Sequence, residues 1–89
     1  YPTTGELNLR VSDPERVFTA LAARYRDADL DHLDGLTVGY PAWWFNIRSS
    51  HTEPVVRLNL EADTEGLMHE KAREVLGVIR EADPGAREV

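Results

Sequence analysis

The sequence predicts an α+β domain in which two helices pack on one face of a mainly antiparallel, four-stranded sheet. Three observations support this. Four short segments alternate apolar and polar residues, two longer segments place apolar residues at helical spacing, and short polar or proline-containing turns separate them. The expected order is strand, helix, strand, strand, strand, helix, and the simplest architecture for that order places both helices on the same face of the sheet.

The first strand and the first helix follow from residue spacing. Residues 5–11 alternate apolar and polar side chains, which is typical of a half-buried strand. The segment Ser12-Asp13-Pro14-Glu15 then predicts a helix start, because it supplies a capping side chain, a proline in the first turn and an acid near the positive end of the helix dipole. The apolar stripe expected along this helix consists of Val17, Phe18, Leu21, Ala22 and Tyr25.

The other three strands are expected over residues 36–40, 43–48 and 56–62, with Pro41-Ala42 as a tight hairpin connection. Alternation assigns the two faces of the last two strands. The core-facing set is Trp43, Phe45, Ile47, Val56, Leu58, Leu60 and Ala62, and the opposite set is Trp44, Asn46, Arg48, Arg57, Asn59 and Glu61. The opposite set holds more polar chemistry than a bare solvent face usually does, so we expect that face to contact something.

A second helix is expected at the C-terminal end. Asp63 or Thr64 provides its cap, and Asp83-Pro84-Gly85 ends it. Gly66 and Gly77 each weaken this helix by about 1 kcal/mol relative to alanine, so packing of the apolar stripe must hold it in place. The stripe consists of Met68, Ala72, Val75, Leu76 and Ile79.

Length and composition limit the functions open to the chain. Its 89 residues predict a single domain over residues 1–89. The sequence has no cysteine, which removes disulfide and thiolate chemistry and is compatible with a reducing cytoplasm. It has no long apolar run, and its net charge of -6 argues against nucleic acid or an acidic membrane as a partner. Because the chain begins at Tyr1 rather than methionine, we expect it to come from a longer protein.

A polar loop between the last two predicted strands is the candidate site. Arg48 offers a planar guanidinium suited to bidentate contacts with an oxyanion, and Ser50, His51 and Thr52 add side-chain donors and backbone N–H groups at a turn. Pro54 stiffens the exit of the loop. The sequence therefore predicts a phosphate or carboxylate site, without a metal, formed by Arg48, Ser50, His51 and Thr52.

Other charged residues have structural interpretations. The acidic segment 27–35 lacks the glycine and the bidentate glutamate that a calcium loop requires, so a surface connection is favoured over a metal site, and His32 is expected to be exposed within it. Arg57 is expected to form an ion pair with Glu61 on the sheet face. Glu53 is expected to be a structural carboxylate of the loop, because a negative side chain directed at a phosphate would be repulsive.

Several motifs occur together with a spacing that resembles a known family. They are Asp34-Gly35-Leu36, Trp43-Trp44-Phe45, the pattern R-x-S-x-T-E-P over residues 48–54, and Leu60-Glu61-Ala62. Together they resemble the C-terminal domain of phosphohexomutases, and most closely the bacterial phosphomannomutase/phosphoglucomutase group. The resemblance extends from about Gly5 to the end of the last helix, so it covers nearly the whole chain.

The resemblance implies a four-domain parent enzyme that interconverts 1-phospho and 6-phospho sugars through a bisphosphorylated intermediate. In this family the last domain has a TATA-binding-protein-like fold, and its loop holds the phosphate that is not transferred and closes the cleft. By position, Arg48 would make charged contacts to that phosphate, and Ser50 and Thr52 would donate hydroxyl and backbone hydrogen bonds. His51 stands where the family often has asparagine or glycine, so the resemblance implies backbone donation at that position.

The resemblance also implies which parts this chain does not supply. The phosphoserine, the magnesium-binding aspartates and the loop that reads the sugar belong to the other three domains, so no cofactor is expected in this chain and the isolated domain is expected to be inactive. The expected partners are a sugar phosphate and those three domains. Glucose, mannose and glucosamine phosphates stay open as substrates, because the residues that select among them lie elsewhere.

Two other functions are weighed against this one. A self-standing anion-binding or regulatory module is disfavoured by the long match to a terminal domain. A nucleic-acid binder with an aromatic stacking platform is disfavoured by the acidic balance. Consecutive aromatic residues also point to alternate faces, so of Trp43, Trp44 and Phe45 only Trp44 could stack on a base.

Overall fold

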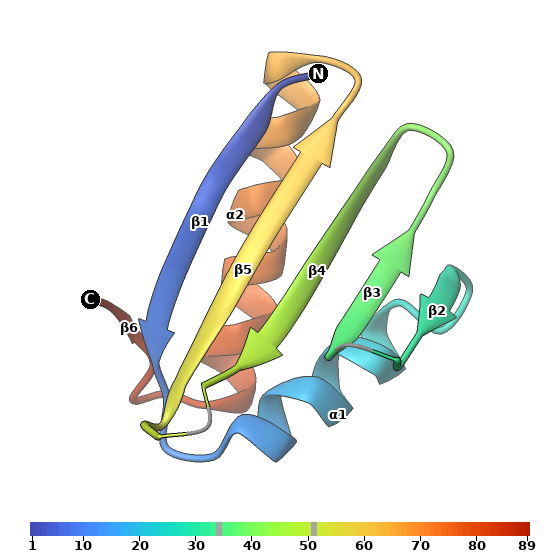
Figure 1. Cartoon of the computed structure of the whole chain (residues 1–89). Coiled ribbons are helices and arrows are strands. Elements are labelled where there is room, and N and C mark those ends of the chain that lie inside the picture. Colours follow the sequence, from blue (N-terminus) through green and yellow to red (C-terminus); the bar gives the residue numbers. More distant parts are fainter. Residues whose placement is uncertain (34, 51) are drawn as a thin grey trace.

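In the computed structural model, an antiparallel sheet is backed by two helices that lie on the same face (Figure 1). The structure describes residues 1–33, 35–50 and 52–89. Its elements are β1 (Thr3–Arg10), α1 (Pro14–Arg24), β2 (Asp29–Asp31), β3 (Leu36–Gly39), β4 (Trp43–Ser49), β5 (Val55–Ala62), α2 (Glu65–Ala82) and β6 (Arg87–Glu88). The strand order is β2-β3-β4-β5-β1-β6, and all neighbouring strands are antiparallel.

The predicted α+β class and the placement of both helices are confirmed, but the prediction of four strands is wrong, because the described residues form six. The additional strands, β2 and β6, lie at the two edges of the sheet. β2 has three residues and β6 has two, and they pair with β3 and β1 respectively. Segments this short cannot display an alternating pattern, and the aspartates of β2 are more typical of a loop.

The core lies between the sheet and the two helices. The residues predicted to face it are buried in the structure, namely Trp43, Phe45, Ile47, Val56, Leu58, Leu60 and Ala62. The helices contribute Val17, Leu21, Met68, Val75 and Ile79. Because β4 and β5 pair in register from Trp43 opposite Ala62 to Ser49 opposite Val56, the residues that alternate with the buried ones lie on the open face of the sheet.

Both helices start where the sequence predicts. Asp13 caps α1, and its side chain accepts a hydrogen bond of 3.1 Å from the N–H of Glu15. Of the two predicted caps of α2, Thr64 is the one used, and its hydroxyl oxygen accepts a hydrogen bond of 3.1 Å from the N–H of Leu67. Neither helix in the described part of the chain combines the length and the apolarity needed to cross a membrane.

A buried carboxylate ties the two helices together at their ends. Asp83 follows α2, is 1% exposed and accepts hydrogen bonds from the backbone N–H groups of Ser12 (2.6 Å) and Asp13 (3.1 Å). Burial alone would raise the pKa of Asp83, but the hydrogen bonds from Asp13 and Ser12 outweigh it, so the pKa lies below its usual value. The sequence predicted only that a helix ends here. In the structure, Asp83 also fixes the end of α2 to the turn between β1 and α1.

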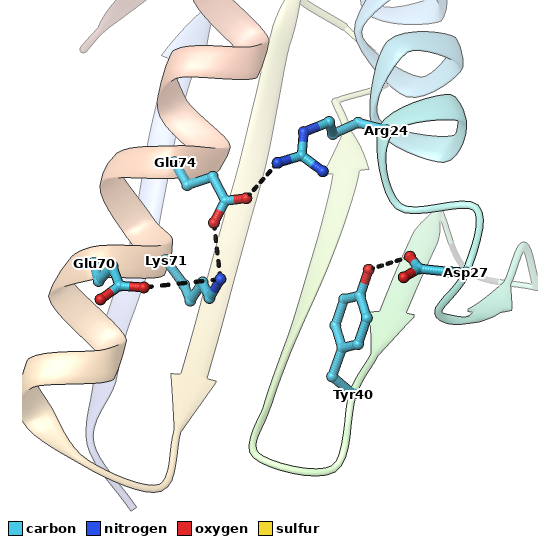
Figure 2. A network of polar contacts seen from close by, with 6 residues as sticks. All are labelled: Arg24, Asp27, Tyr40, Glu70, Lys71 and Glu74. Atoms are coloured by element: carbon cyan, nitrogen blue, oxygen red, sulfur yellow. Dashed lines mark hydrogen bonds and ion pairs between the residues drawn. The ribbon is translucent and has the colours of Figure 1, made fainter.

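Charged side chains connect α1 to α2 at the surface (Figure 2). Arg24 of α1 points toward Glu74 of α2, with an Nη2–Oε1 distance of 2.9 Å, and Glu74 also accepts a hydrogen bond of 3.0 Å from Lys71. In the same view, the hydroxyl of Tyr40 donates a hydrogen bond of 2.7 Å to Asp27 in the segment that follows α1. These contacts fix α1 against both α2 and the end of β3.

An aromatic cluster lies at this end of the core. The ring of Tyr25 meets the rings of Tyr40, Trp43 and Phe45 edge-on, at centroid distances of 6.1, 5.6 and 5.5 Å respectively. The hydroxyl of Tyr25 is buried and makes no hydrogen bond of good geometry among the described residues, although the carboxylate of Glu74 acts on it electrostatically. The packing of the rings, rather than the hydroxyl, therefore accounts for the contribution of Tyr25 to stability.

Candidate anion-binding site

A depression of about 470 Å³ lies where the chain leaves β4. Its lining comes from α1, from the turn before β3, from the end of β4, from the β4–β5 connection and from β5. The residues are Phe18, Gly35, Arg48, Ser49, Ser50, Thr52 and Arg57. Two of them are arginines and none of these described lining residues is acidic, so the depression favours an anion although the chain as a whole is acidic.

Three of the four predicted site residues line this depression. Arg48 is the penultimate residue of β4, and Ser50 and Thr52 follow in the connection to β5. His51, the fourth, lies outside the described residues, so its role stays a prediction. The grouping of the other three follows from the hairpin, which returns the chain within a few residues.

The connection between β4 and β5 is closed by backbone hydrogen bonds. The N–H of Ser50 donates to the carbonyl oxygen of Val55 (2.8 Å), and the N–H of Val55 donates to that of Glu53 (2.8 Å). The hydroxyl oxygens of Ser50 and Thr52 lie 3.4 Å apart, and the N–H of Thr52 donates to the Ser50 oxygen at 3.3 Å. Because the N–H of Ser50 closes the loop, its hydroxyl is the group that it can offer to an anion.

The loop is also anchored to the end of β1. The N–H of Val11 donates a hydrogen bond of 2.8 Å to the carbonyl oxygen of Pro54. Arg10 and Glu53 form an ion pair of 3.2 Å between partly exposed side chains, a kind of contact that contributes little to stability but orients both groups. Glu53 thus pairs with Arg10 and does not line the depression, in agreement with its interpretation as a structural carboxylate.

Arg57 also lines the depression, whereas the sequence interpretation favoured a structural role for it. The predicted ion pair with Glu61 is wrong, because four residues along a strand span about 13 Å. Glu61 instead accepts a hydrogen bond of 2.9 Å from the indole nitrogen of Trp44. Arg57 lies opposite Arg48 in the β4–β5 pairing. This pairing follows from the closure of the loop, in which the N–H of Ser50 donates to the carbonyl oxygen of Val55. Arg48 lies two residues before Ser50, and Arg57 lies two residues after Val55.

The rest of the open face continues from the two arginines. Asn46 lies opposite Asn59, and Trp44, which is 40% exposed, lies opposite Glu61. The side-chain amide of Asn46 donates a hydrogen bond of 2.9 Å to the hydroxyl of Thr37. The expectation that this face contacts something stays a prediction.

The acidic segment before β3 is a surface connection with a short strand in it. His32 is exposed, as predicted, and the carboxylate of Asp31 accepts a hydrogen bond of 2.8 Å from the N–H of Leu33. In the described ranges, no group of three or more histidine, aspartate or glutamate side chains is arranged to hold a metal ion.

Fold and site together define a small two-layer α+β domain with an arginine-lined depression at one end of its sheet. The sequence matches the family described as "Phosphoglucomutase/phosphomannomutase, C-terminal domain" over residues 6–78, and the chain belongs to this family. This confirms the family that the motifs of the sequence suggested.

Individual relatives agree with this assignment. A phosphomannomutase from Methanocaldococcus jannaschii is 42% identical over 83 residues, which cover 93% of this chain and 18% of that protein. A phosphomannomutase from Escherichia coli is 40% identical over 84 residues, which cover 90% of this chain and 18% of that protein. A crystal structure of a phosphoglucomutase/phosphomannomutase family protein from Burkholderia thailandensis matches with a TM-score of 0.75 and 30% identity, over 98% of this chain and 19% of that one. The chain thus spans less than a fifth of the length of these relatives.

Proposed function

We propose that this chain is the phosphate-holding domain of a phosphohexomutase, an isomerase that moves a phosphoryl group between two positions of a hexose. One observation carries the proposal. Arg48 and Arg57 lie opposite each other beside Ser50 and Thr52, in a chain of the phosphoglucomutase/phosphomannomutase C-terminal domain family. A sugar phosphate is the ligand class that suits both the charge of the depression and the family.

In this proposal the domain holds the phosphate group that is not transferred. Each guanidinium can donate two parallel hydrogen bonds to phosphate oxygens, and the hydroxyls of Ser50 and Thr52 add two more donors. A substrate fixed at one end presents its other end in a productive geometry, and closure of this domain over the cleft would exclude water. The chain's own contribution is therefore binding, orientation and closure.

The transfer step itself would take place on other domains. The phosphoserine and the magnesium ion, which the family resemblance assigns to those domains, would supply the nucleophile and the charge neutralisation that phosphoryl transfer requires. The protein partner is then the remainder of a longer polypeptide, which the 18% coverage of the two phosphomannomutases supports. We also propose a cytoplasmic location, with which the cysteine-free sequence is compatible.

The binding part of the proposal is tested by NMR. Isotopically labelled chain is titrated with inorganic phosphate and with mannose 6-phosphate while the backbone amide signals are followed. We expect shifts that centre on Arg48, Ser50, Thr52 and Arg57, and a dissociation constant on the order of millimolar, equivalent to about 4 kcal/mol, because a single anion site is open to solvent.

A pair of arginine variants makes this titration specific. Arg48→Ala is expected to weaken phosphate binding about tenfold, because a hydrogen bond to a charged group contributes roughly 1.5–3 kcal/mol when it is desolvated and less when it is exposed. Arg73→Ala removes the same charge from an exposed position of α2 outside the depression and should leave the affinity nearly unchanged. Equal effects of the two variants, or shifts elsewhere on the surface, would contradict the assignment of the site.

A further inference from the structure

Gly35 approaches Arg48 more closely than any residue with a side chain could. Its φ is +74°, a left-handed backbone conformation that favours glycine. A methyl carbon at this position would overlap the carbonyl oxygen of Ile47, and it would lie 2.8 Å from Cγ and 3.1 Å from Cα of Arg48. Two of these three atoms belong to the backbone of β4, so the contact cannot be relieved by rotating a flexible side chain alone.

The strand register explains this approach. Leu36 pairs with Ile47, so the residue before Leu36 lies beside the residue after Ile47, which is Arg48. On its other side Arg48 pairs with Arg57. A row of Gly35, Arg48 and Arg57 therefore runs from the residue before β3 across β4 to β5, and all three residues line the depression.

We propose that Gly35 is a positioning residue for Arg48. Because Gly35 has no side chain, the turn before β3 can close against the aliphatic stem of Arg48 and direct its guanidinium toward the same anion as that of Arg57. A stem that is held before the ligand arrives loses less rotamer freedom on binding, so the site is preorganised. The identity of the anion as a phosphate rests on the function proposed above, whereas the ordering of Arg48 by Gly35 does not.

The chain contains a matched control for this inference. Gly5 in β1 has almost the same backbone conformation, with a φ of +68°, but a methyl carbon there would meet nothing within 4 Å. Gly35→Ala and Gly5→Ala therefore carry the same kind of backbone strain, and only Gly35→Ala adds contacts with Arg48 and Ile47. Gly35→Asn is a second variant, since asparagine tolerates the left-handed region and still adds a Cβ atom.

The first readout needs no ligand. Relaxation of the Arg48 side-chain Nε–H signal is measured by NMR in the wild-type chain and in the three variants. We expect an ordered guanidinium in the wild type and in Gly5→Ala, and a mobile or displaced one in Gly35→Ala and Gly35→Asn. If Arg48 is equally ordered in all four proteins, or is mobile already in the wild type, the inference is overturned, whether or not phosphate binds.

The second readout is the affinity for inorganic phosphate, measured on the folded proteins. Gly35→Ala is expected to lower the affinity about tenfold and Gly5→Ala less than about twofold. In an Arg48→Ala background, Gly35→Ala should cause no further loss, because the residue that it positions is absent. An additional loss of similar size in that background would overturn the inference. A wild-type chain with an ordered Arg48 and no affinity for phosphate would instead refute the proposed function and leave the positioning role of Gly35 supported.

Discussion

Arg48 and Arg57 lie directly opposite each other on β4 and β5, and like charges in that position destabilise a sheet. An anion bound in the proposed site would lower this cost. Sequence reasoning grouped Arg48, Ser50 and Thr52, which line one depression in the structure, because they are close along one loop. It did not place Arg57 beside Arg48, because that placement depends on which residues face each other across the two strands, and His51 stays a prediction.

At the same scale, Asp83 gives a prediction for the pH dependence of stability. Its pKa is lowered in the folded protein relative to the usual value of 3.8, so the folded state binds this proton less readily than the unfolded chain. The stabilisation is fully present above about pH 4 and is lost as the pH falls through the folded-state pKa. Asp83→Asn should cost about 1–3 kcal/mol at pH 7 and flatten the acid limb of the stability curve.

Urea unfolding at pH 7 and at several lower pH values would measure this effect. Asp29→Asn serves as the control, because Asp29 is an exposed aspartate on the edge strand β2. If the stability curves of Asp83→Asn and the wild type run parallel below pH 4, the lowered pKa of Asp83 does not contribute to stability as described.

Among the elements, the longer strands and both helices could be predicted, and the two edge strands could not. β4, β5 and the helices each bury several side chains, so their apolar spacing is visible in the sequence. β2 and β6 are held mainly by backbone pairing with β3 and β1, and backbone pairing leaves no pattern of side chains. Asp83 shows the same limit, because its partners, Ser12 and Asp13, lie about seventy positions away in the sequence.

The contacts that fix α1 against α2 and against the end of β3 can be tested for their contribution to stability. Two tyrosine variants that differ in their hydroxyl contacts serve this purpose. Tyr40→Phe removes the hydrogen bond to Asp27 and should destabilise the fold by about 1 kcal/mol. Tyr25→Phe removes a buried hydroxyl that makes no hydrogen bond of good geometry among the described residues, so it should be neutral or stabilising by up to about 1 kcal/mol. Denaturant midpoints measure both, and a large destabilisation by Tyr25→Phe would show that its hydroxyl does have a partner.

A titration of the tyrosine hydroxyls provides an independent check on the contact between Tyr40 and Asp27. Burial, the hydrogen bond to Asp27 and the charge of that carboxylate raise the pKa of Tyr40 to about 12. The folded state therefore keeps this proton between about pH 10 and 12 while the unfolded chain loses it, so stability should fall as the pH rises through that range. In Asp27→Asn the absorbance change of Tyr40 should move to lower pH.

For the molecule as a whole, the position of the charges says more about the ligand than the net charge does. The chain carries a net charge of -6, yet its depression is lined by two arginines and by no acidic residue among those described. Such a local site suits a small anion that is held at one end, and it does not suit an extended polyanion. In the proposed enzyme this domain would supply binding and orientation, and the reacting groups would come from the remainder of a longer chain.

The most direct test of the central claim is the kinetics of a mutase that contains this domain. In a chimera, this chain replaces the matching segment of the Methanocaldococcus jannaschii phosphomannomutase, and the conversion of mannose 6-phosphate is followed with and without Arg48→Ala. The isolated chain should show no turnover. We predict that Arg48→Ala raises KM, lowers kcat and reduces kcat/KM at least about tenfold while the fold stays intact. Kinetics of the variant equal to those of the unmodified chimera, or turnover by the isolated chain, would contradict the account.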